Sequence, residues 1–285
     1  MLNLCNVNEI KPLLSEYGFH FSKAKGQNFL TADWVPRRIA EEAGVDRDAG
    51  VLEIGPGIGP LTQQLCLRAG KVTAVEVDKT LAPILRRTLG EFDNLELIFD
   101  DVMKLDLAEL IGARFAGLRP MACANLPYYI TSPILTLLLE SKLFDSVTVM
   151  VQKEVAQRIC AAPGTADYSA FTVFCNYYAV PKILFDVPPA CFLPQPKVTS
   201  AVITLPRRRE PVCEVRDEEL FFKVVRASFA MRRKTLVNGL AAGFPDHSKQ
   251  ELTDLLTALG HAPTVRGETL SIPQFAAIAN ALTES

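Results

Sequence analysis

The segment Asn125-Leu126-Pro127-Tyr128 combines an amide, a proline-stiffened backbone and an aromatic ring within four residues. The residues just before it, 121–124, are apolar, which predicts a buried strand of a parallel sheet. Asn and Pro end that strand, and Thr131-Ser132-Pro133 predicts the capped start of a helix that runs through Glu140. Ligands of open α/β sheets bind beyond the carboxyl ends of the strands, so this segment is the first candidate site.

These residue types suit alkylation of an amino group on a nucleobase. The exocyclic amine of adenine is a poor nucleophile because its lone pair is delocalised into the ring. Two oxygens that accept its hydrogens, from the Asn125 side chain and the Leu126 backbone, would favour tetrahedral geometry at that nitrogen and free the lone pair. Tyr128 would stack on the ring. The simpler interpretation is a strand-to-helix turn with Asn as a cap and Tyr in rim packing.

A glycine turn, residues 53–59, lies between a predicted strand and a predicted helix. Gly55 and Gly57 would let the backbone approach a ligand closely, and the helix N-terminus adds positive potential. A dinucleotide fingerprint requires Gly or Ala three residues after the second glycine, where this chain has Pro60. The charge of Glu53 suits a cationic ligand better than a phosphate, and the sulfonium and amino groups of S-adenosylmethionine are both positive.

Acidic residues also end the next two predicted strands. Glu76 follows the glycine turn by about 20 residues, where an acid would hold a ribose diol. Asp101 ends the third strand and could accept a hydrogen bond from an adenine amino group. A single acid at a strand end is usually solvated. Three acids and a glycine turn at successive strand ends instead indicate a nucleoside-binding cleft.

Alternating strands and helices predict a Rossmann-like, doubly wound and mostly parallel α/β sheet. Strands are expected at 51–54, 71–76, 95–99, 121–124, 146–151, 182–187 and 201–205. Helices are expected at 8–18, 31–43, 60–69, 80–89 and 131–140, and further ones at 217–229, 233–242, 249–259 and 273–282. The segment 206–211 marks a boundary. We therefore expect an α/β domain at 1–206 and a small all-α domain at 207–285.

Composition limits the partners and the cellular compartment that the protein can be expected to have. The 285 residues carry a formal net charge of −2, which neither requires nor excludes a polyanion as a partner. The seven cysteines contain no close pair of the metal-binding kind, which fits reduced thiols in a cytoplasmic protein without a metal site. We see no signal peptide and no membrane span, so no membrane partner is expected.

Basic residues cluster after the boundary. Lys223, Arg226, Arg232, Arg233 and Lys234 fall within twelve residues that contain no acid, and Arg207 and Arg208 lie upstream. A solvated helix face is the usual explanation for such a run. Because acids are absent, we favour a surface that contacts nucleic-acid phosphates.

Taken together, these motifs resemble those of the bacterial ribosomal RNA adenine N6-dimethyltransferases, which modify two adjacent adenines near the 3′ end of small-subunit RNA. The resemblance covers nearly the whole chain. It rests on residues 26–30, 53–59, Glu76, Asp101, 125–133 and 192–200.

The resemblance implies roles for individual residues. The binding site for the cofactor S-adenosylmethionine would be lined by Asn28, Leu30, Gly55, Glu76, Asp101 and Asn125. The target adenine would be held by Asn125, Leu126, Pro127, Tyr128 and Phe192, the last in a proline-braced loop opposite Tyr128. The partner would be small-subunit ribosomal RNA in an immature 30S particle, and we expect the chain to act as a monomer.

Three alternatives stay open. A related adenine methyltransferase could act on large-subunit RNA or on DNA, which testing the substrates would separate. A nicotinamide dehydrogenase is disfavoured by Pro60, and the cofactor that shifts the melting temperature would distinguish it. A non-catalytic assembly factor that binds pre-ribosomal RNA is disfavoured because every expected site residue is present.

Overall fold

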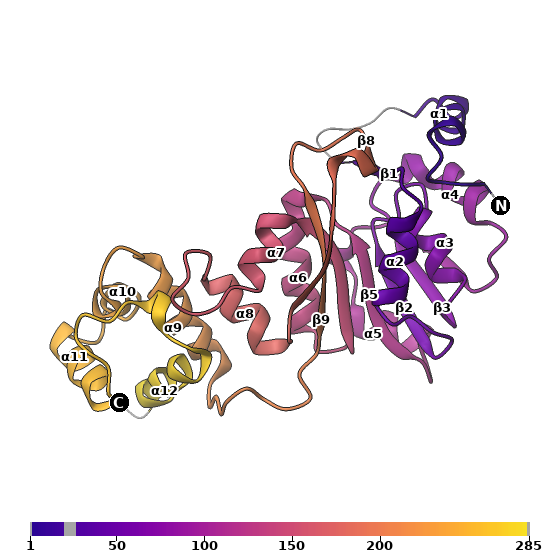
Figure 1. The fold of residues 1–285 in the computed structure, drawn as a ribbon. Helices are drawn as coiled ribbons and strands as arrows, with labels where there is room; N and C mark the ends of the chain where they lie inside the picture. The colour runs from indigo at the N-terminus through magenta and orange to yellow at the C-terminus, as the bar shows by residue number, and fades with distance from the viewer. Residues whose placement is uncertain (1, 20–26, 284–285) are drawn as a thin grey trace. The chain divides into compact units, whose positions relative to one another are not determined.

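A computed structural model describes residues 2–19 and 27–283, so Gly26 of the 26–30 motif lies outside the described residues. Its main sheet has seven strands in the order β4-β3-β2-β5-β6-β9-β7 (Figure 1). Their bounds are β2 Ala49–Ile54, β3 Lys71–Val75, β4 Leu95–Ile98, β5 Arg119–Asn125, β6 Ser146–Gln152, β7 Lys182–Val187 and β9 Ser200–Pro206. The five strands from β4 to β6 run parallel, and β9 runs antiparallel to both β6 and β7. The predicted mostly parallel sheet is therefore confirmed.

The winding of the sheet reverses between β2 and β5. From β2 the chain continues outward through β3 and β4, and then returns to place β5 on the other side of β2. Ile54 pairs with Ala124 in the parallel register. The glycine turn after β2 and the segment after β5 therefore leave the same edge of the sheet, at the position where doubly wound folds bind ligands.

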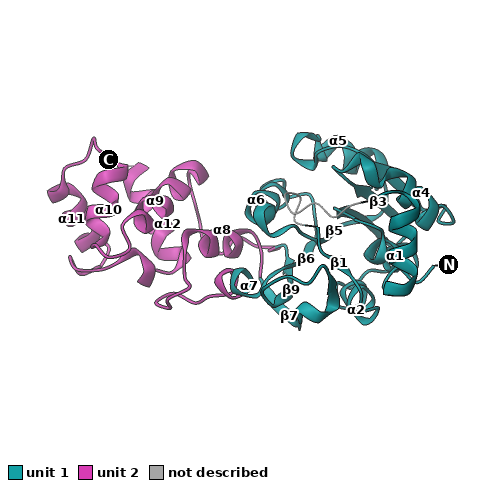
Figure 2. Cartoon of the chain, turned by 90° about the horizontal axis from the view of Figure 1, so that it is seen from above, with its two compact units in different colours: residues 1–156, 181–207 teal, residues 157–180, 208–285 magenta. Residues whose placement is uncertain are grey.

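Helices cover both faces of this sheet, with α5 and α6 on one side and α2 on the other in Figure 2. The helices of this part are α1 Val7–Glu16, α2 Trp34–Glu42, α3 Pro60–Cys66, α4 Ala82–Leu89, α5 Leu107–Arg114, α6 Thr131–Glu140 and α7 Lys153–Ile159. Most elements begin and end within a few residues of the prediction. Helices α5 and α7 were not predicted. The cap expected at 131–133 also differs, since Ile130 is the N-cap and Thr131 is the first helical residue.

A small second sheet explains one wrong helix boundary. Strands β1, Phe29–Leu30, and β8, Phe192–Leu193, pair antiparallel. The Thr31 N–H then donates to the carbonyl of Cys191 at 2.8 Å, which extends the pairing. Thr31 therefore continues an extended segment, and α2 begins at Trp34 and not at residue 31 as predicted.

The chain divides into two compact units, 1–156 with 181–207 and 157–180 with 208–285 (Figure 2). The second unit contains α8 Ala170–Tyr178, α9 Glu218–Ala230, α10 Leu236–Gly243, α11 Lys249–Ala258 and α12 Ile272–Thr283. Phe221 and Phe275 are fully buried in its core. None of the helices within 2–19 and 27–283 has the length and hydropathy needed to cross a membrane.

This division differs from the expected boundary at 206 in one respect, because residues 157–180 belong to the helical unit. The reason is aromatic packing by α8. The rings of Tyr177 and Phe221 lie 5.0 Å apart, and those of Phe174 and Phe222 lie 5.5 Å apart. The local sequence of α8 is apolar, but it does not specify which core the helix joins.

Candidate active site

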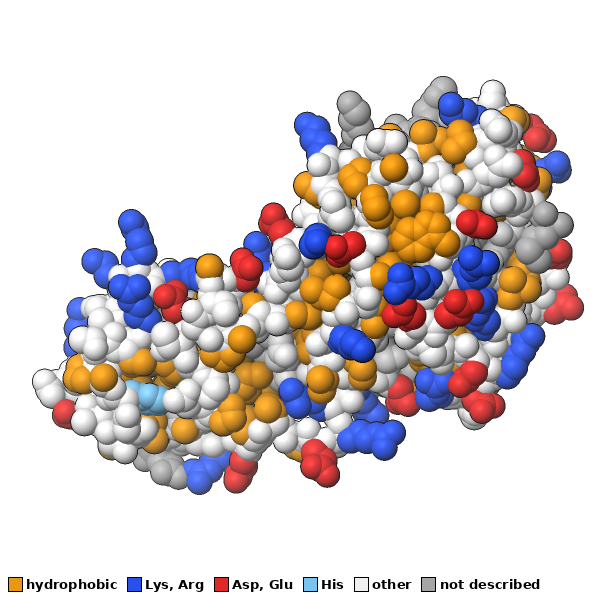
Figure 3. All heavy atoms as spheres, viewed as in Figure 1, with side chains coloured by type: hydrophobic (Ala, Val, Ile, Leu, Met, Phe, Trp, Pro, Cys, Tyr) orange, Lys and Arg blue, Asp and Glu red, His pale blue; other side chains and the backbone are white. Residues whose placement is uncertain are grey.

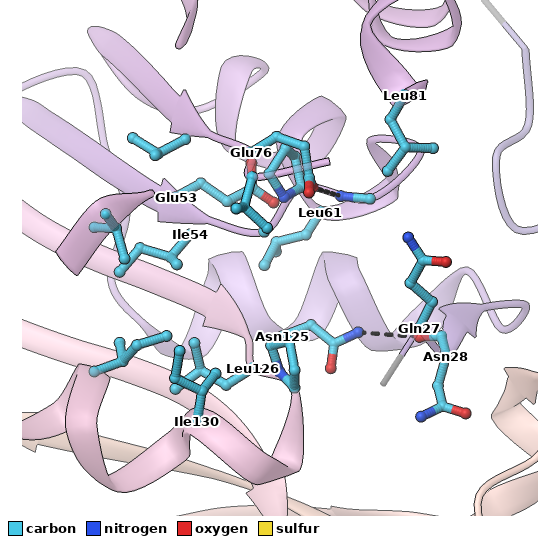
Figure 4. Close-up of a pocket in the computed structure, with 18 of the residues that line it drawn as sticks. Gln27, Asn28, Glu53, Ile54, Leu61, Glu76, Leu81, Asn125, Leu126 and Ile130 are labelled. Atoms are coloured by element: carbon cyan, nitrogen blue, oxygen red, sulfur yellow. Dashed lines mark hydrogen bonds between the residues drawn. The ribbon is translucent and has the colours of Figure 1, made fainter. Parts of the chain in front are cut away.

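A cavity of about 240 Å³ opens at the switch point between β2 and β5 (Figure 4). Most of the predicted cofactor and adenine residues line it. They are Asn28, Leu30, Glu53, Gly55, Gly57, Glu76, Asp101, Asn125, Leu126, Pro127 and Tyr128. Residues from four strand ends and from the N-terminal segment therefore meet at one place, as parallel strands of this order require.

The glycine turn is shaped by backbone that other residues rarely adopt. Gly55 and Gly57 have φ of 68° and 61°, in the left-handed region that favours glycine. A Cβ on Gly57 would also approach the Phe29 ring to 3.2 Å. The turn thus leaves bare backbone at the cavity wall, where a ligand could approach closely.

Glu76 ties the turn to the end of β3. Its Oε2 accepts a hydrogen bond from the Gly57 N–H at 3.2 Å, and its Oε1 accepts one from the Asp78 N–H at 2.8 Å. Asp78 in turn accepts from the Gln27 side chain at 2.9 Å. A carboxylate fixed by these two bonds therefore lines the cavity where a ribose diol was expected.

Glu53 is a buried acid at the end of β2, with only 1% of its surface exposed. Burial raises its pKa to about 8, the Thr62 hydroxyl lowers it in part, and the negative charge of Glu76 raises it further. Neither Glu53 Oε2 nor Thr62 Oγ1 has a hydrogen bond of regular geometry among the described residues. A buried carboxylate oxygen without such a partner favours a cationic ligand beside it.

Asn125 and Leu126 line the cavity at the end of β5. The Asn125 Nδ2 donates to the carbonyl of Asn28 at 3.4 Å (Figure 4). No described residue donates to its Oδ1. The Leu126 N–H donates to the carbonyl of Met150 at 3.2 Å, which fixes that peptide on β6. Since it has no donor among the described residues, Asn125 Oδ1 is available to accept a hydrogen bond from a ligand.

Tyr128 is held by a hydrogen bond of 2.6 Å between its hydroxyl and Ser200 Oγ. Burial raises the pKa of Tyr128 above its ordinary value, and this hydrogen bond offsets part of the rise. The phenol therefore stays neutral near pH 7. A neutral ring fixed at the cavity wall is suited to stacking on a base.

The chain matches the sequence model of the family described as "Ribosomal RNA adenine dimethylase" over residues 18–284. It belongs to this family. The chain is 49% identical over 276 residues to "Ribosomal RNA small subunit methyltransferase A" of Geobacillus thermodenitrificans, covering 95% of this chain and 94% of that protein. It is 48% identical over 287 residues to the protein of that name from Bacillus mycoides, covering 99% and 98%.

Two solved structures share the fold of this dimethylase. The 23S rRNA methyltransferase ErmE has a TM-score of 0.67 and 28% identity, covering 90% of this chain and 100% of that one. A dimethyladenosine transferase from Plasmodium falciparum has a TM-score of 0.73 and 24% identity, covering 90% and 97%. At its lower identity, the second comparison supports the fold alone.

The cofactor of the dimethylase is S-adenosyl-L-methionine, and the residues at the cavity fit it. When bound, it supplies an electrophilic methyl group beside a sulfonium cation. A cation beside the buried Glu53, whose Oε2 has no regular hydrogen bond among the described residues, would favour its ionised form, and the fixed carboxylate of Glu76 suits a diol. The open backbone of the glycine turn completes a surface for a nucleoside. Among the described residues, no cluster of His, Cys, Asp or Glu could hold a metal ion.

The raised pKa of Glu53 predicts a pH-dependent stability in the dimethylase without cofactor. Between the ordinary value of 4.5 and about 8, the native state binds more protons than the unfolded state. The free energy of unfolding is therefore unaffected below this window and falls as pH rises through it.

We expect wild type to lose on the order of a few kcal/mol between pH 5 and 8 relative to Glu53→Gln, which stays neutral throughout. Urea unfolding at several pH values would measure the difference. A constant difference from pH 5 to 8 would show that Glu53 does not titrate in this window.

The structure places Phe192 and Asp101, both predicted site residues, in different surroundings. Phe192 does not line the cavity, and its stacking on the target base stays a prediction. Only 3% of the surface of Phe192 is exposed, and the side chain packs in the core of the first unit. Pairing of Phe192 with Leu30 on β1 explains this placement. Asp101 lines the cavity as predicted, and one of its oxygens accepts from the Met103 N–H at 3.0 Å.

Several residues that line the cavity of the dimethylase were not predicted from the sequence. Val77 and Val102 line the cavity directly after Glu76 and Asp101. A simple signal could have found them, because the residue after a strand-ending acid leaves the sheet at the same edge. Tyr129, also missed, lines the cavity with 64% of its surface exposed.

The seven predicted RNA-binding residues fall into different surroundings. Three arginines hold backbone carbonyls of their own unit: Arg207 donates to Lys142 at 3.0 Å, Arg208 to Asn176 at 2.8 Å, and Arg232 to Ala166 at 2.7 Å. The Lys223 ammonium lies 4.5 Å from the centre of the Phe244 ring.

Arg226, Arg233 and Lys234 are exposed, without a hydrogen bond or ion pair from their side chains to the described residues. Figure 3 shows Lys and Arg side chains gathered at the edge of the helical unit near α10.

Proposed function

We propose that this chain transfers methyl groups from S-adenosylmethionine to the N6 amino groups of two adjacent adenines near the 3′ end of small-subunit (16S) ribosomal RNA. The observation that carries this proposal is the Asn125 amide, whose oxygen has no donor among the described residues, at a cavity that Leu126, Glu53 and Glu76 also line. The names of the relatives at 48% and 49% identity support the small subunit as substrate.

In this proposal the chain acts mainly by positioning its substrates. Asn125 Oδ1 and the Leu126 carbonyl accept the two amine hydrogens, which localises the lone pair on nitrogen. The Asn28 carbonyl orients the Asn125 amide through Nδ2. Tyr128 holds the plane of the base, and the amine proton passes to water once the new bond forms. Because sulfur leaves readily, correct placement supplies most of the acceleration.

We also propose that the chain acts as a monomer on an immature 30S particle in the cytoplasm. The exposed cations Arg226, Arg233 and Lys234 would contact phosphates of the RNA.

Product analysis tests the proposed reaction. Undermethylated small subunits, large-subunit RNA and DNA would each be incubated with the protein and tritiated S-adenosylmethionine, followed by nucleoside analysis. We expect label in N6,N6-dimethyladenosine from small subunits only, and none from subunits that are already dimethylated. Label confined to large-subunit RNA or DNA would contradict the proposed substrate, and no label on any substrate would favour a non-catalytic assembly factor.

Neutralising the three exposed cations should weaken RNA binding and reduce its salt dependence. With Arg226, Arg233 and Lys234 all changed to Gln, we expect the negative slope of log K against log salt to become smaller in magnitude by about 2, since each lost phosphate contact contributes about 0.7 to 0.9. Lys11, Arg37 and Arg87 are exposed on the first unit and provide a control with the same charge change. Equal effects of the two triple variants would contradict a specific phosphate-binding surface.

A further inference from the structure

Tyr129 carries the most exposed of the large hydrophobic side chains in residues 2–19 and 27–283, at 64%. A single exposed aromatic residue is common and needs no explanation. Tyr129, however, also lines the cavity that holds Asn125 and Tyr128. Its ring therefore stands in water at the edge of the proposed active site.

The backbone that carries this ring is well fixed. Tyr129 is the central residue of the 3₁₀ turn η4, Tyr128–Ile130, which follows Pro127. The Pro127 carbonyl accepts from the Ile130 N–H at 3.2 Å and from the Thr131 hydroxyl at 3.4 Å. Helix α6 begins at Thr131, so regular helical structure also fixes the backbone directly after the turn. Ordering this ring against a ligand would therefore cost little beyond its two side-chain torsions.

The geometry of the turn separates its three side chains. A 3₁₀ helix has three residues per turn, so successive side chains point about 120° apart. Tyr128 is bonded to Ser200, and Ile130 is half-buried at the cavity. Tyr129 is the residue of this turn that presents most of its side chain to solvent.

The proposed reaction supplies a partner for this ring. When one adenine is withdrawn from the RNA stack, the next base loses its neighbour and exposes a face. The Cα atoms of Tyr128 and Tyr129 are about 3.8 Å apart. If the Tyr128 ring holds the target adenine, the Tyr129 ring is therefore close enough to contact the adjacent base. Aromatic rings stack on any base, which suits a site that must accept two successive targets.

We propose that Tyr129 stacks on the nucleotide adjacent to the target adenine and so helps to select single-stranded RNA with a base next to the target. This inference rests on the proposed function. Tyr129 acts here as a specificity-determining residue that contacts RNA outside the pocket for the reacting base. Neither the cofactor nor the reacting amine is its partner.

The first test compares Tyr129→Ala with Tyr129→Phe on undermethylated small subunits. Loss of one stacked base should lower kcat/KM roughly 5- to 150-fold in Tyr129→Ala. Tyr129→Phe retains the ring and should stay close to wild type. The affinity of both variants for S-adenosylhomocysteine, measured by calorimetry, should equal that of wild type. Weaker cofactor binding in Tyr129→Ala would overturn the inference, because the ring would then contact the cofactor.

A double-mutant cycle separates stacking from a purely structural role. Small subunits would be reconstituted with RNA that lacks the base next to the target adenine. On this substrate, wild type should lose the same factor that Tyr129→Ala loses on intact RNA, and Tyr129→Ala should lose nothing further.

The outcomes distinguish this inference from the proposed function. Equal losses for Tyr129→Ala on both substrates, or no loss on either, would overturn the inference while methylation by wild type continues. A wild-type protein that is inactive on every small-subunit substrate would overturn the proposed function, and with it this inference.

Discussion

Replacing Asn125 by alanine should lower the single-turnover rate of methyl transfer by about 10²- to 10³-fold, the range measured when one hydrogen-bonding group that stabilises a transition state is removed. The Asn125 amide oxygen has no donor among the described residues, so the substrate amine would be its partner. Affinity for S-adenosylhomocysteine should change little, because this interaction matters most in the transition state.

Asn94 provides a matched control for this substitution. Its Nδ2 donates to the carbonyls of Cys66 and Ala69, both at 3.0 Å, and it does not line the cavity. Asn94→Ala should therefore lower the melting temperature while the single-turnover rate of the folded protein stays near that of wild type. A wild-type rate in Asn125→Ala would remove Asn125 from the mechanism.

Replacing Glu76 by alanine should weaken S-adenosylhomocysteine binding roughly 100-fold, as expected for the loss of two hydrogen bonds to a charged group. The substitution also releases the N–H groups of Gly57 and Asp78, which loosens the glycine turn. Isothermal titration calorimetry would measure the dissociation constant. Because the charge of Glu76 raises the pKa of Glu53, the stability loss attributed to Glu53 should end at a lower pH in this variant.

Asp106→Ala is the control for the Glu76 substitution. Asp106 also accepts a backbone hydrogen bond, from the Glu109 N–H at 3.0 Å, but it lies outside the cavity. Its removal should leave the dissociation constant unchanged. Equal affinity of wild type and Glu76→Ala would contradict a direct contact between Glu76 and the cofactor.

The sheet and most of the cavity could be predicted from the sequence because both follow from local patterns. Apolar runs such as 146–151 specify strands that are buried on both faces. Once the strands are parallel, the residues at their carboxyl ends must meet at one edge. Glu53, Glu76 and Asn125 lie far apart in the sequence but are brought together by this rule alone.

Features fixed by distant contacts could not be predicted in the same way. Phe192 is buried because β8 pairs with β1, a contact between segments more than 160 residues apart. Arg232 belongs to a run of basic residues that suggests a phosphate-binding surface, yet its guanidinium donates to the carbonyl of Ala166. In both cases residue type was informative, and the partner was set by tertiary packing.

The most direct test of the central claim is a structure of the protein bound to S-adenosylhomocysteine and an RNA that contains the target adenine. We predict that the amine nitrogen lies about 3 Å from both Asn125 Oδ1 and the Leu126 carbonyl oxygen, at hydrogen-bonding distance. An adenine whose amine faces away from these two oxygens, or an Asn125 amide turned into the protein, would contradict the account.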